Sequence, residues 1–295
     1  MKLYDIIIIG AGPAGMSAAV YGTRAGKSVM VLEAIYHGGQ ASTTSEIDNY
    51  LGFPNGIPGP ELMHRFHEQA ARFGTEFVYE EFLELREGEP LIVKTTAAEY
   101  SAKNVIIATG ATPSPLGVDG EDRLRGAGVS YCATCDGAFF RGKTVAVVGG
   151  GNTAVEEAIY LAEMCEKVYL IHRRDELRAD SIIANAAIAH EKIEILWNTT
   201  VKSIEGEDKV EHLILNDDSK LEVSGIFIAV GTLPNSTKFQ GTIEMDAKGF
   251  IITDSLMKTN VANVFAIGDV RNTPLRQVIT AAADGAIAAS NVIVR

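Results

Sequence analysis

Residues 6–15 read Ile-Ile-Ile-Ile-Gly-Ala-Gly-Pro-Ala-Gly and decide the fold of this chain. The run Ile6–Ile9 predicts a parallel strand that is buried on both faces. The pattern from Gly10 to Gly15 predicts a tight turn into a helix over Pro13–Ala25, and the N-terminus of that helix can bind a pyrophosphate. A second strand is expected at Ser28–Leu32. Glu33 follows that strand, where a carboxylate can accept hydrogen bonds from a ribose diol. The alternative, a glycine-rich turn without a ligand, does not account for this full strand, turn and helix context.

The same pattern recurs in the middle of the chain. Thr144–Val148 predicts a strand, Gly149–Ala154 a second glycine turn, and Val155–Met164 a helix that leads to a strand at Val168–Ile171. This second strand ends in a basic cluster instead of an acidic residue, made of His172, Arg173, Arg174 and Arg178. Guanidinium groups suit a 2′-phosphate, which they bind through paired hydrogen bonds. The alternative is a solvated basic turn. We expect the second unit to bind NADPH and the first to bind an adenosine without a 2′-phosphate.

The order of strands and helices predicts an α/β fold with two Rossmann-like dinucleotide-binding domains. Three later strands, Val105–Ile107, Ile226–Val230 and Val264–Ile267, each end in a further glycine turn. Prolines and a glycine over 113–117 mark one linker, and a second is expected near Gln240–Thr242. We therefore expect the NADPH domain, 115–242, to be inserted into a first domain made of 1–114 and 243–295.

Composition excludes some classes of function. The chain has 295 residues with a formal net charge of −12, which argues against nonspecific nucleic-acid binding. No apolar run is long enough to span a membrane, and no signal peptide is evident before the first strand. We therefore expect a cytoplasmic protein.

Two of the three cysteines, Cys132 and Cys135, have the spacing of a short reversible disulfide. Thiols in such pairs often have a lowered pKa, and the thiolate is the reacting form. Asp136 follows directly, and its carboxyl group could exchange a proton with a leaving sulfur. A zinc half-site is the first alternative, but it needs two further soft ligands, and Cys165 lies on a helix with no close histidine. A pair of inert core thiols is the second alternative. Cys165 itself is expected to be a core residue.

With these motifs in place, the chain resembles the low-molecular-weight bacterial thioredoxin reductases over essentially its whole length. The resemblance rests on Gly10–Gly15, Gly38-Gly39-Gln40, residues 46–50, Ala108-Thr109-Gly110, Cys132–Asp136, Gly149–Ala154, His172–Arg178, Gly268-Asp269 and Arg276-Gln277. The larger glutathione-reductase type carries its cysteines soon after the first glycine turn, where this chain has none.

The motifs and the resemblance together imply two sets of cofactor-binding residues. FAD is expected at Gly10, Gly12, Pro13, Ala14, Gly15, Glu33, Gly39, Gln40, Asn49, Ala108, Thr109, Gly110, Gly268, Asp269, Arg276, Gln277 and Val278. NADPH is expected as cosubstrate at Gly149, Gly151, Asn152, Thr153, His172, Arg173, Arg174 and Arg178.

The resemblance also implies the roles of the redox residues. Cys135 would face the flavin, Cys132 would attack the disulfide of thioredoxin, and Asp136 would be the acid. Phe139 and Phe140 match an apolar pair that contacts thioredoxin in the family; interior packing is their alternative role. A homodimer is implied by the resemblance alone, as is rotation of the inserted domain between two states.

The expected activity is transfer of electrons from NADPH through FAD and the Cys132–Cys135 disulfide to oxidised thioredoxin. Three alternatives remain on the same scaffold. One is a ferredoxin-dependent enzyme, which would not need the NADPH residues. Another is a small-molecule dithiol oxidase, which would not need Arg173, Arg174 and Arg178. The third belongs to another class, a noncatalytic flavin redox sensor.

Overall fold

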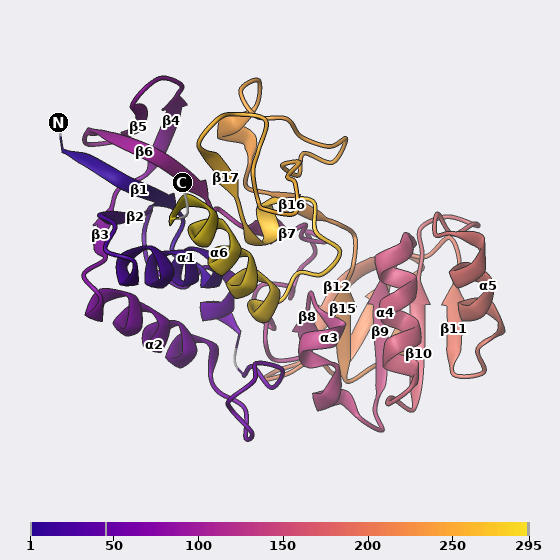
Figure 1. Cartoon of the computed structure of the whole chain (residues 1–295). Helices are drawn as coiled ribbons and strands as arrows, with labels where there is room; N and C mark the ends of the chain where they lie inside the picture. Colours follow the sequence, from indigo (N-terminus) through magenta and orange to yellow (C-terminus); the bar gives the residue numbers. More distant parts are fainter. Residues whose placement is uncertain (1, 45, 294–295) are drawn as a thin grey trace. The chain divides into compact units, whose positions relative to one another are not determined.

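The computed structural model describes residues 2–44 and 46–293. The chain forms two compact units, which Figure 1 shows. Unit 1 consists of Met1–Thr112 and Leu233–Arg295, and unit 2 is Pro113–Thr232. In the described ranges, no helix has the length and apolar character needed to cross a bilayer.

Unit 1 is built on a mostly parallel sheet. Its strands are β1 (Leu3–Ile9), β2 (Val29–Glu33), β3 (Glu76–Tyr79), β4 (Phe82–Arg86), β5 (Leu91–Thr95), β6 (Glu99–Ile107) and β17 (Val264–Ala266). The order is β3-β2-β1-β6-β5-β4, and β17 pairs with β6 next to its C-terminal end. β4 and β5 run antiparallel to their neighbours, whereas β1, β2, β3, β6 and β17 are mutually parallel.

Three α-helices complete unit 1: α1 (Pro13–Arg24), α2 (Gly59–Arg72) and α6 (Val278–Ile293). Figure 1 shows α6 beside α1, although the two are far apart in sequence. Successive residues of a strand point to opposite faces of its sheet. Ile6 and Ile8 accordingly join the core under α1 and α6, while Ile7 and Ile9 join a second core on the other face. The isoleucine run is thus buried on both faces, as the sequence predicts.

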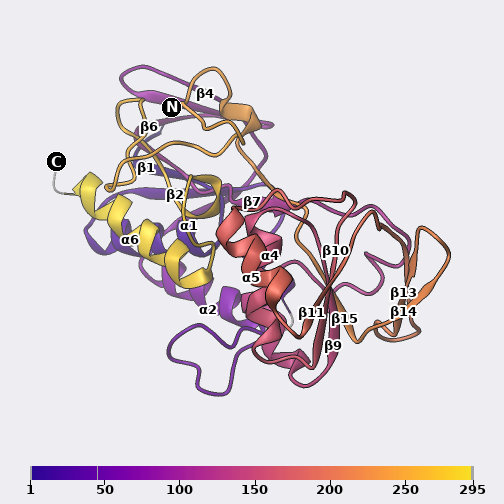
Figure 2. The same ribbon diagram turned by 90° about the vertical axis from the view of Figure 1, so that its right-hand side faces the viewer.

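Unit 2 holds a second, fully parallel sheet in the order β11-β10-β9-β15-β8. Its strands are β8 (Val129–Ser130), β9 (Thr144–Val148), β10 (Lys167–Ile171), β11 (Ile193–Leu196) and β15 (Gly225–Ile228). The helices are α3 (Ala133–Asp136), α4 (Asn152–Ala162) and α5 (Ser181–Ala189). Figure 2 shows α4 and α5 on one side of this sheet. On the other side lies an antiparallel sheet of β12 (Val201–Glu205), β13 (His212–Leu215) and β14 (Lys220–Glu222). The α/β class with two Rossmann-like units is thereby confirmed.

The chain passes between the units twice, at β7 (Ala111–Pro113) and β16 (Thr232–Pro234), which pair with each other. Short 3-10 helices complete the fold: η1 (Gly39–Thr43), η2 (Gly137–Phe140), η3 (Thr237–Phe239) and η4 (Gly268–Val270).

The second boundary lies at Thr232, whereas the sequence suggested residue 242. The intervening residues pack on unit 1. The Phe239 ring stacks on Phe82 with centroids 4.9 Å apart, and Lys238 pairs with Glu81 at 2.6 Å. The glycine and polar residues near 240 therefore form a surface turn of unit 1.

Candidate functional site

Cys132 and Cys135 form a disulfide at a strand–helix junction of unit 2. Their Cα atoms are 5.3 Å apart, and Cys132 is the residue directly before α3. β8 ends two residues earlier, at Ser130, and its parallel pairing with β15 fixes where the turn begins. Both cysteines are half-buried. The pair is therefore held by the same sheet that carries the second glycine turn.

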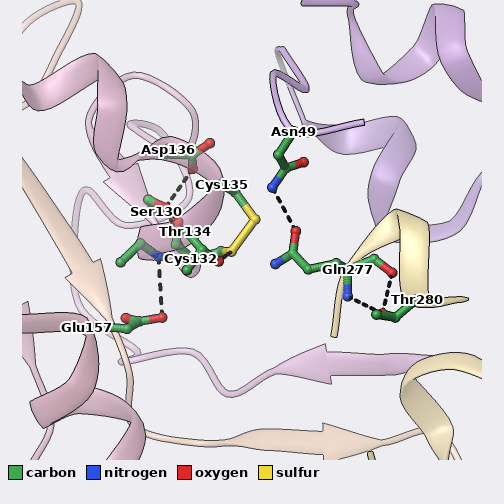
Figure 3. Close-up of a disulfide and its surroundings, with 10 residues drawn as sticks. Asn49, Ser130, Cys132, Thr134, Cys135, Asp136, Glu157, Gln277 and Thr280 are labelled. Carbon is green, nitrogen blue, oxygen red and sulfur yellow. Dashed lines mark hydrogen bonds between the residues drawn. A yellow bond between two sulfur atoms is a disulfide. The ribbon is translucent and has the colours of Figure 1, made fainter. Parts of the chain in front are cut away.

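The carboxyl group of Asp136 is tied to this turn through a serine (Figure 3). The Ser130 hydroxyl donates to Asp136 Oδ2 at 2.6 Å, and the Cys132 N–H donates to Ser130 Oγ at 3.1 Å. Burial raises the pKa of Asp136 above its usual value, and the Ser130 hydrogen bond opposes the shift. A carboxyl group that keeps its proton to a higher pH suits a proton donor next to a reducible disulfide.

The first glycine turn links β1 to α1. A Cβ at Gly10 would lie 2.3 Å from the carbonyl oxygen of Ala108, and one at Gly15 would lie 2.0 Å from that of Gly10. A side chain at either position would displace backbone. A Cβ at Gly12, in contrast, would meet no atom within 4 Å. The turn is thus closely packed on its inner side and open at its middle glycine, as a pyrophosphate site requires.

Two segments from elsewhere in unit 1 reach this turn. Gly39 lies against Gly12, since a Cβ at Gly39 would be 3.5 Å from the Gly12 Cα. Glu33 Oε2 accepts the N–H of Ala11 at 3.0 Å, so its carboxylate stands beside the turn. The sequence-predicted Gly39-Gln40 segment begins η1, at the same place.

The end of β17 reaches the same turn from the C-terminal part of unit 1. Gly268, at a positive φ of 69°, lies against Ala14 of α1. Asp269 follows it, and burial raises the pKa of this carboxyl to about 6, against the effect of Arg276. Among the described residues, no hydrogen bond to the Asp269 carboxylate is made.

Asn49 and Gln277 are also brought together. The Asn49 amide donates to Gln277 Oε1 at 2.9 Å (Figure 3). Val278 follows as the first residue of α6 and packs on a small core with Ile47 and Ile57. The guanidinium of Arg276 lies over the Phe250 ring, 4.1 Å from its centroid.

The turn Ala108-Thr109-Gly110 after β6 is fixed by Asn235. The Thr109 hydroxyl donates to the Asn235 carbonyl at 2.7 Å, and the Asn235 amide donates to the Thr109 carbonyl at 2.9 Å. The Asn235 N–H donates to the Gly110 carbonyl at 3.0 Å. These bonds hold the end of β6 next to the first glycine turn, which Ala108 already contacts.

The second glycine turn links β9 to α4 in the same manner. A Cβ at Gly149 would lie 2.5 Å from that of Ala154, whereas one at Gly151 would meet nothing within 4 Å. Gly151 precedes α4, and Asn152 and Thr153 are its first two residues. The middle glycines of both turns, Gly12 and Gly151, therefore present open faces at a helix N-terminus.

The basic segment after β10 is fastened to this second turn. The Arg178 N–H donates to the Gly150 carbonyl at 2.7 Å. The side chains of Asn152 and Asp180 are also bonded, at 2.7 Å, and the Asp180 N–H donates to Asn152 Oδ1 at 2.9 Å. The side chains of Arg173, Arg174 and Arg178 are exposed. The segment thus brings three exposed guanidinium groups to the strand end next to an open glycine.

Comparison with known proteins gives one consistent result. Residues 4–285 match the model of the pyridine nucleotide-disulphide oxidoreductases. The chain belongs to the pyridine nucleotide-disulphide oxidoreductase family. Within it, the chain is 48% identical to thioredoxin reductase of Bacillus subtilis, over 99% of this chain and 94% of the relative. It is 43% identical to that of Listeria monocytogenes, over 98% of this chain and 93% of the relative. The crystal structure of thioredoxin reductase from Streptococcus pyogenes superposes with a TM-score of 0.94 at 44% identity, covering 98% of this chain and 97% of that one.

Membership of this family confirms the resemblance inferred from the motifs, including its low-molecular-weight type. The protein is an oxidoreductase, and the family implies use of a flavin and a pyridine nucleotide. The prediction that Cys165 is a core residue is also confirmed, since its side chain is buried among α4 and its neighbours.

Two of the expected site residues, Phe140 and His172, are buried. The Phe140 ring is buried, meets Phe227 edge-on at 5.3 Å and fills the space beside Gly225. Its alternative role, interior packing, is therefore the one observed, and only Phe139 is exposed. His172 is buried as well, and its imidazole occupies the space that a side chain at Gly150 would need. Its Nε2 lies 2.9 Å from the Glu176 carbonyl, so the imidazole packs between the second glycine turn and the backbone of the basic segment.

Three further residues of the site were not expected from the sequence: Ser130, Glu157 and Asp180. Ser130 joins Asp136 to the Cys132 backbone, Asp180 holds Asn152, and Glu157 contacts the redox turn from α4. Each forms hydrogen bonds with a residue distant in sequence or with the backbone, and local sequence patterns rarely reveal such bonds. The position of Ser130, two residues before Cys132 at the end of a strand, is the only signal that could have suggested one of them.

Proposed function

We propose that this chain is an NADPH-dependent thioredoxin-disulfide reductase that carries FAD. The observation that carries the proposal is the Cys132–Cys135 disulfide beside the Asp136 carboxyl, in a chain with two dinucleotide turns. The relatives that match nearly the full length are named thioredoxin reductases, which supports thioredoxin as the protein substrate.

The first glycine turn fits FAD. Gly12 leaves room for a pyrophosphate at the N-terminus of α1, and Glu33 stands where a ribose would bind. The buried Asp269 carboxylate, without a protein hydrogen bond among the described residues, offers an acceptor for a ribityl hydroxyl. Gly39, Gln40, Asn49, Thr109 and Gln277 would complete the site. When bound, the flavin supplies an electron pair that originates from NADPH.

The second glycine turn fits NADPH. Gly151 is open for a pyrophosphate, and the exposed side chains of Arg173, Arg174 and Arg178 could bind a 2′-phosphate. A phosphate dianion on guanidinium groups forms charge-assisted, often paired, hydrogen bonds. This electrostatic match favours NADPH over NADH and argues against a ferredoxin-dependent relative.

The redox turn supplies the remaining chemistry. Reductive opening of the Cys132–Cys135 bond takes up two electrons, and Asp136 gives the proton that one sulfur takes up. The other sulfur remains a thiolate, which we assign to Cys132. That thiolate forms a bond to one sulfur of the thioredoxin disulfide, and the second thioredoxin sulfur leaves as a thiolate. The exposed Phe139, four residues after Cys135, is an apolar side chain that could contact the partner. Since thiols are kept reduced in the cytoplasm, we propose that the enzyme works there.

The test is NADPH oxidation coupled to reduction of thioredoxin, with Cys135→Ser as the matched variant. The wild-type protein should reduce thioredoxin and bleach its flavin with NADPH under anaerobic conditions. The variant should keep FAD and the reduction of an artificial acceptor such as ferricyanide, because that path needs no cysteine. Thioredoxin turnover retained by the variant would refute the role of Cys135. Flavin bleaching by reduced ferredoxin, with none by NADPH, would refute the electron donor.

A further inference from the structure

A second carboxyl group contacts the redox turn, from the neighbouring helix α4. Glu157 Oε1 accepts a hydrogen bond from the backbone N–H of Ala133 at 3.3 Å (Figure 3). Ala133 follows Cys132 directly, is fully buried and is the first residue of α3. Glu157 therefore holds the peptide group that joins the first cysteine to the helix.

The second carboxylate oxygen of Glu157 has different surroundings from the first. Within the described part of the chain, its Oε2 is buried and has no hydrogen-bond partner. Burial raises the pKa of Glu157 to about 7, and the hydrogen bond from Ala133 opposes this shift. A carboxyl group with these properties changes its charge in the neutral pH range.

Charged neighbours are not the cause. The titratable side chains on elements that pack against α4 are Asp136 and the disulfide-bonded Cys135 on α3, Lys167 and Tyr169 on β10 and Glu194 on β11; α4 itself carries Glu156 and Tyr160. None of these contributes to the pKa shift of Glu157, whose causes are burial and the Ala133 N–H. The pKa of Glu157 is therefore determined by its burial next to the redox turn and by the Ala133 N–H.

Glu157 and Asp136 differ in what they touch. Asp136 lies on the redox turn, and its Oδ2 is bonded to the Ser130 hydroxyl. Glu157 lies on another helix and accepts a hydrogen bond from the backbone of the turn. The first is placed to move a proton, whereas the second can only hold the peptide and alter the local field.

We propose that Glu157 is a positioning residue for the redox disulfide. It anchors the Ala133 peptide and, when it ionises, places a negative charge beside Cys132 that disfavours the Cys132 thiolate. The thiolate is the attacking species in disulfide exchange, so the charge on Glu157 sets how fast the reduced turn reacts. This inference rests on the proposed function, because it concerns the reaction of the reduced cysteine.

The experiment compares three variants of the holoenzyme. Glu157→Gln keeps the acceptor for the Ala133 N–H but cannot ionise. Glu157→Leu removes the acceptor. Glu163→Gln changes one exposed charge directly after the same helix and serves as the control. Cys132 labelling by iodoacetamide is followed by peptide mass spectrometry in the reduced proteins, from about pH 5.5 to about pH 9. Thioredoxin and ferricyanide turnover are measured over the same range.

We expect the labelling profile of wild type to contain a second ionisation near pH 7 that is missing in Glu157→Gln. Above that pH, Glu157→Gln should label about fivefold faster than wild type, because one nearby negative charge is gone. Glu157→Leu should reduce thioredoxin about tenfold more slowly and keep its ferricyanide turnover. Glu163→Gln should match wild type throughout.

Superimposable labelling profiles of Glu157→Gln and wild type would overturn the electrostatic role. Full thioredoxin turnover by Glu157→Leu would overturn the anchoring role. Both readings are separate from failure of the proposed function, which would show as absent thioredoxin turnover in wild type while Cys132 labelling still proceeds.

Discussion

The Ser130 hydroxyl donates a 2.6 Å hydrogen bond to Asp136 Oδ2, and so ties the acid of the redox turn to the strand before it. The same Ser130 oxygen accepts the Cys132 N–H. The Asp136 carboxyl group, the Cys132 backbone and the end of β8 are therefore joined in one hydrogen-bond network.

Replacing this acid should slow the step that opens or remakes the disulfide. We expect Asp136→Asn to lower thioredoxin turnover by about a hundredfold, since it removes a proton donor. Ferricyanide turnover should stay near wild type. Asp122→Asn, an exposed carboxylate of the same unit, is the control. Equal thioredoxin rates for Asp136→Asn and wild type from pH 6 to 8 would show that another group moves the proton.

The arginine segment predicts coenzyme choice. Replacing Arg173, Arg174 and Arg178 together with Gln should raise the KM for NADPH about a hundredfold, because each lost charge-assisted contact costs roughly 1–2 kcal/mol and such losses are not fully additive. The KM for NADH should change little. Lys202→Gln, another exposed cation of unit 2, controls for net charge. Steady-state kinetics with both coenzymes decides the matter, and a parallel rise for NADH would contradict a 2′-phosphate contact.

The two kinds of glycine in the first turn should respond differently to alanine. At Gly15 a Cβ would lie 2.0 Å from the Gly10 carbonyl, so Gly15→Ala must move backbone and should lower the melting temperature by several degrees. At Gly12 the space is open and φ is −80°, so Gly12→Ala should fold with the apoprotein stability of wild type. Its methyl group would stand in the proposed pyrophosphate site. We expect it to lose FAD during purification, which the flavin absorbance per protein measures; full FAD content would place the cofactor elsewhere.

The pKa of Glu157 predicts how stability depends on pH. The group has a usual value of 4.5 and a value of about 7 in the folded protein, so the folded state binds the extra proton. Its contribution is fully present below pH 4.5 and is lost as pH rises through 7, by up to about 3 kcal/mol. Glu157→Gln has no such loss. Its melting temperature should therefore rise relative to wild type between pH 5 and pH 8, and Glu163→Gln should show no such trend.

Much of this fold is readable from the sequence, because dinucleotide turns combine glycine spacing with strand and helix periodicity. β9 begins and ends where expected, at Thr144 and Val148. α4, however, begins at Asn152 and not at Val155. Gly151 caps this helix, and the polar residues Asn152 and Thr153 form its first turn, where the apolar periodicity has not yet begun. The antiparallel sheet β12-β13-β14 was not predicted; its strands are only three to five residues long, and β12 and β14 carry charged residues, which weakens any alternation.

The site was predictable where chemistry needs a particular residue type at a fixed spacing, as at Cys132, Cys135 and Asp136. It was less predictable where the residue acts by packing. Phe139 and Phe140 are neighbours in a 3-10 helix, and only the structure shows that one ring is in the core and the other is exposed. The contact of Glu157 with Ala133 joins residues that lie 24 positions apart, and sequence spacing does not reveal it.

The pairing of β7 with β16 gives unit 2 adjacent ends. The Ser114 N–H donates to the Gly231 carbonyl at 2.9 Å, and in unit 1 the Asn235 N–H donates to the Gly110 carbonyl at 3.0 Å. Each unit thus closes its own backbone at the place where the chain leaves it. Insertion of one domain into another is tolerated when the inserted ends lie close together. Unit 2 is therefore exchangeable in principle. Another fold with neighbouring termini could take its place between Thr112 and Leu233 without breaking a strand of the unit 1 sheet.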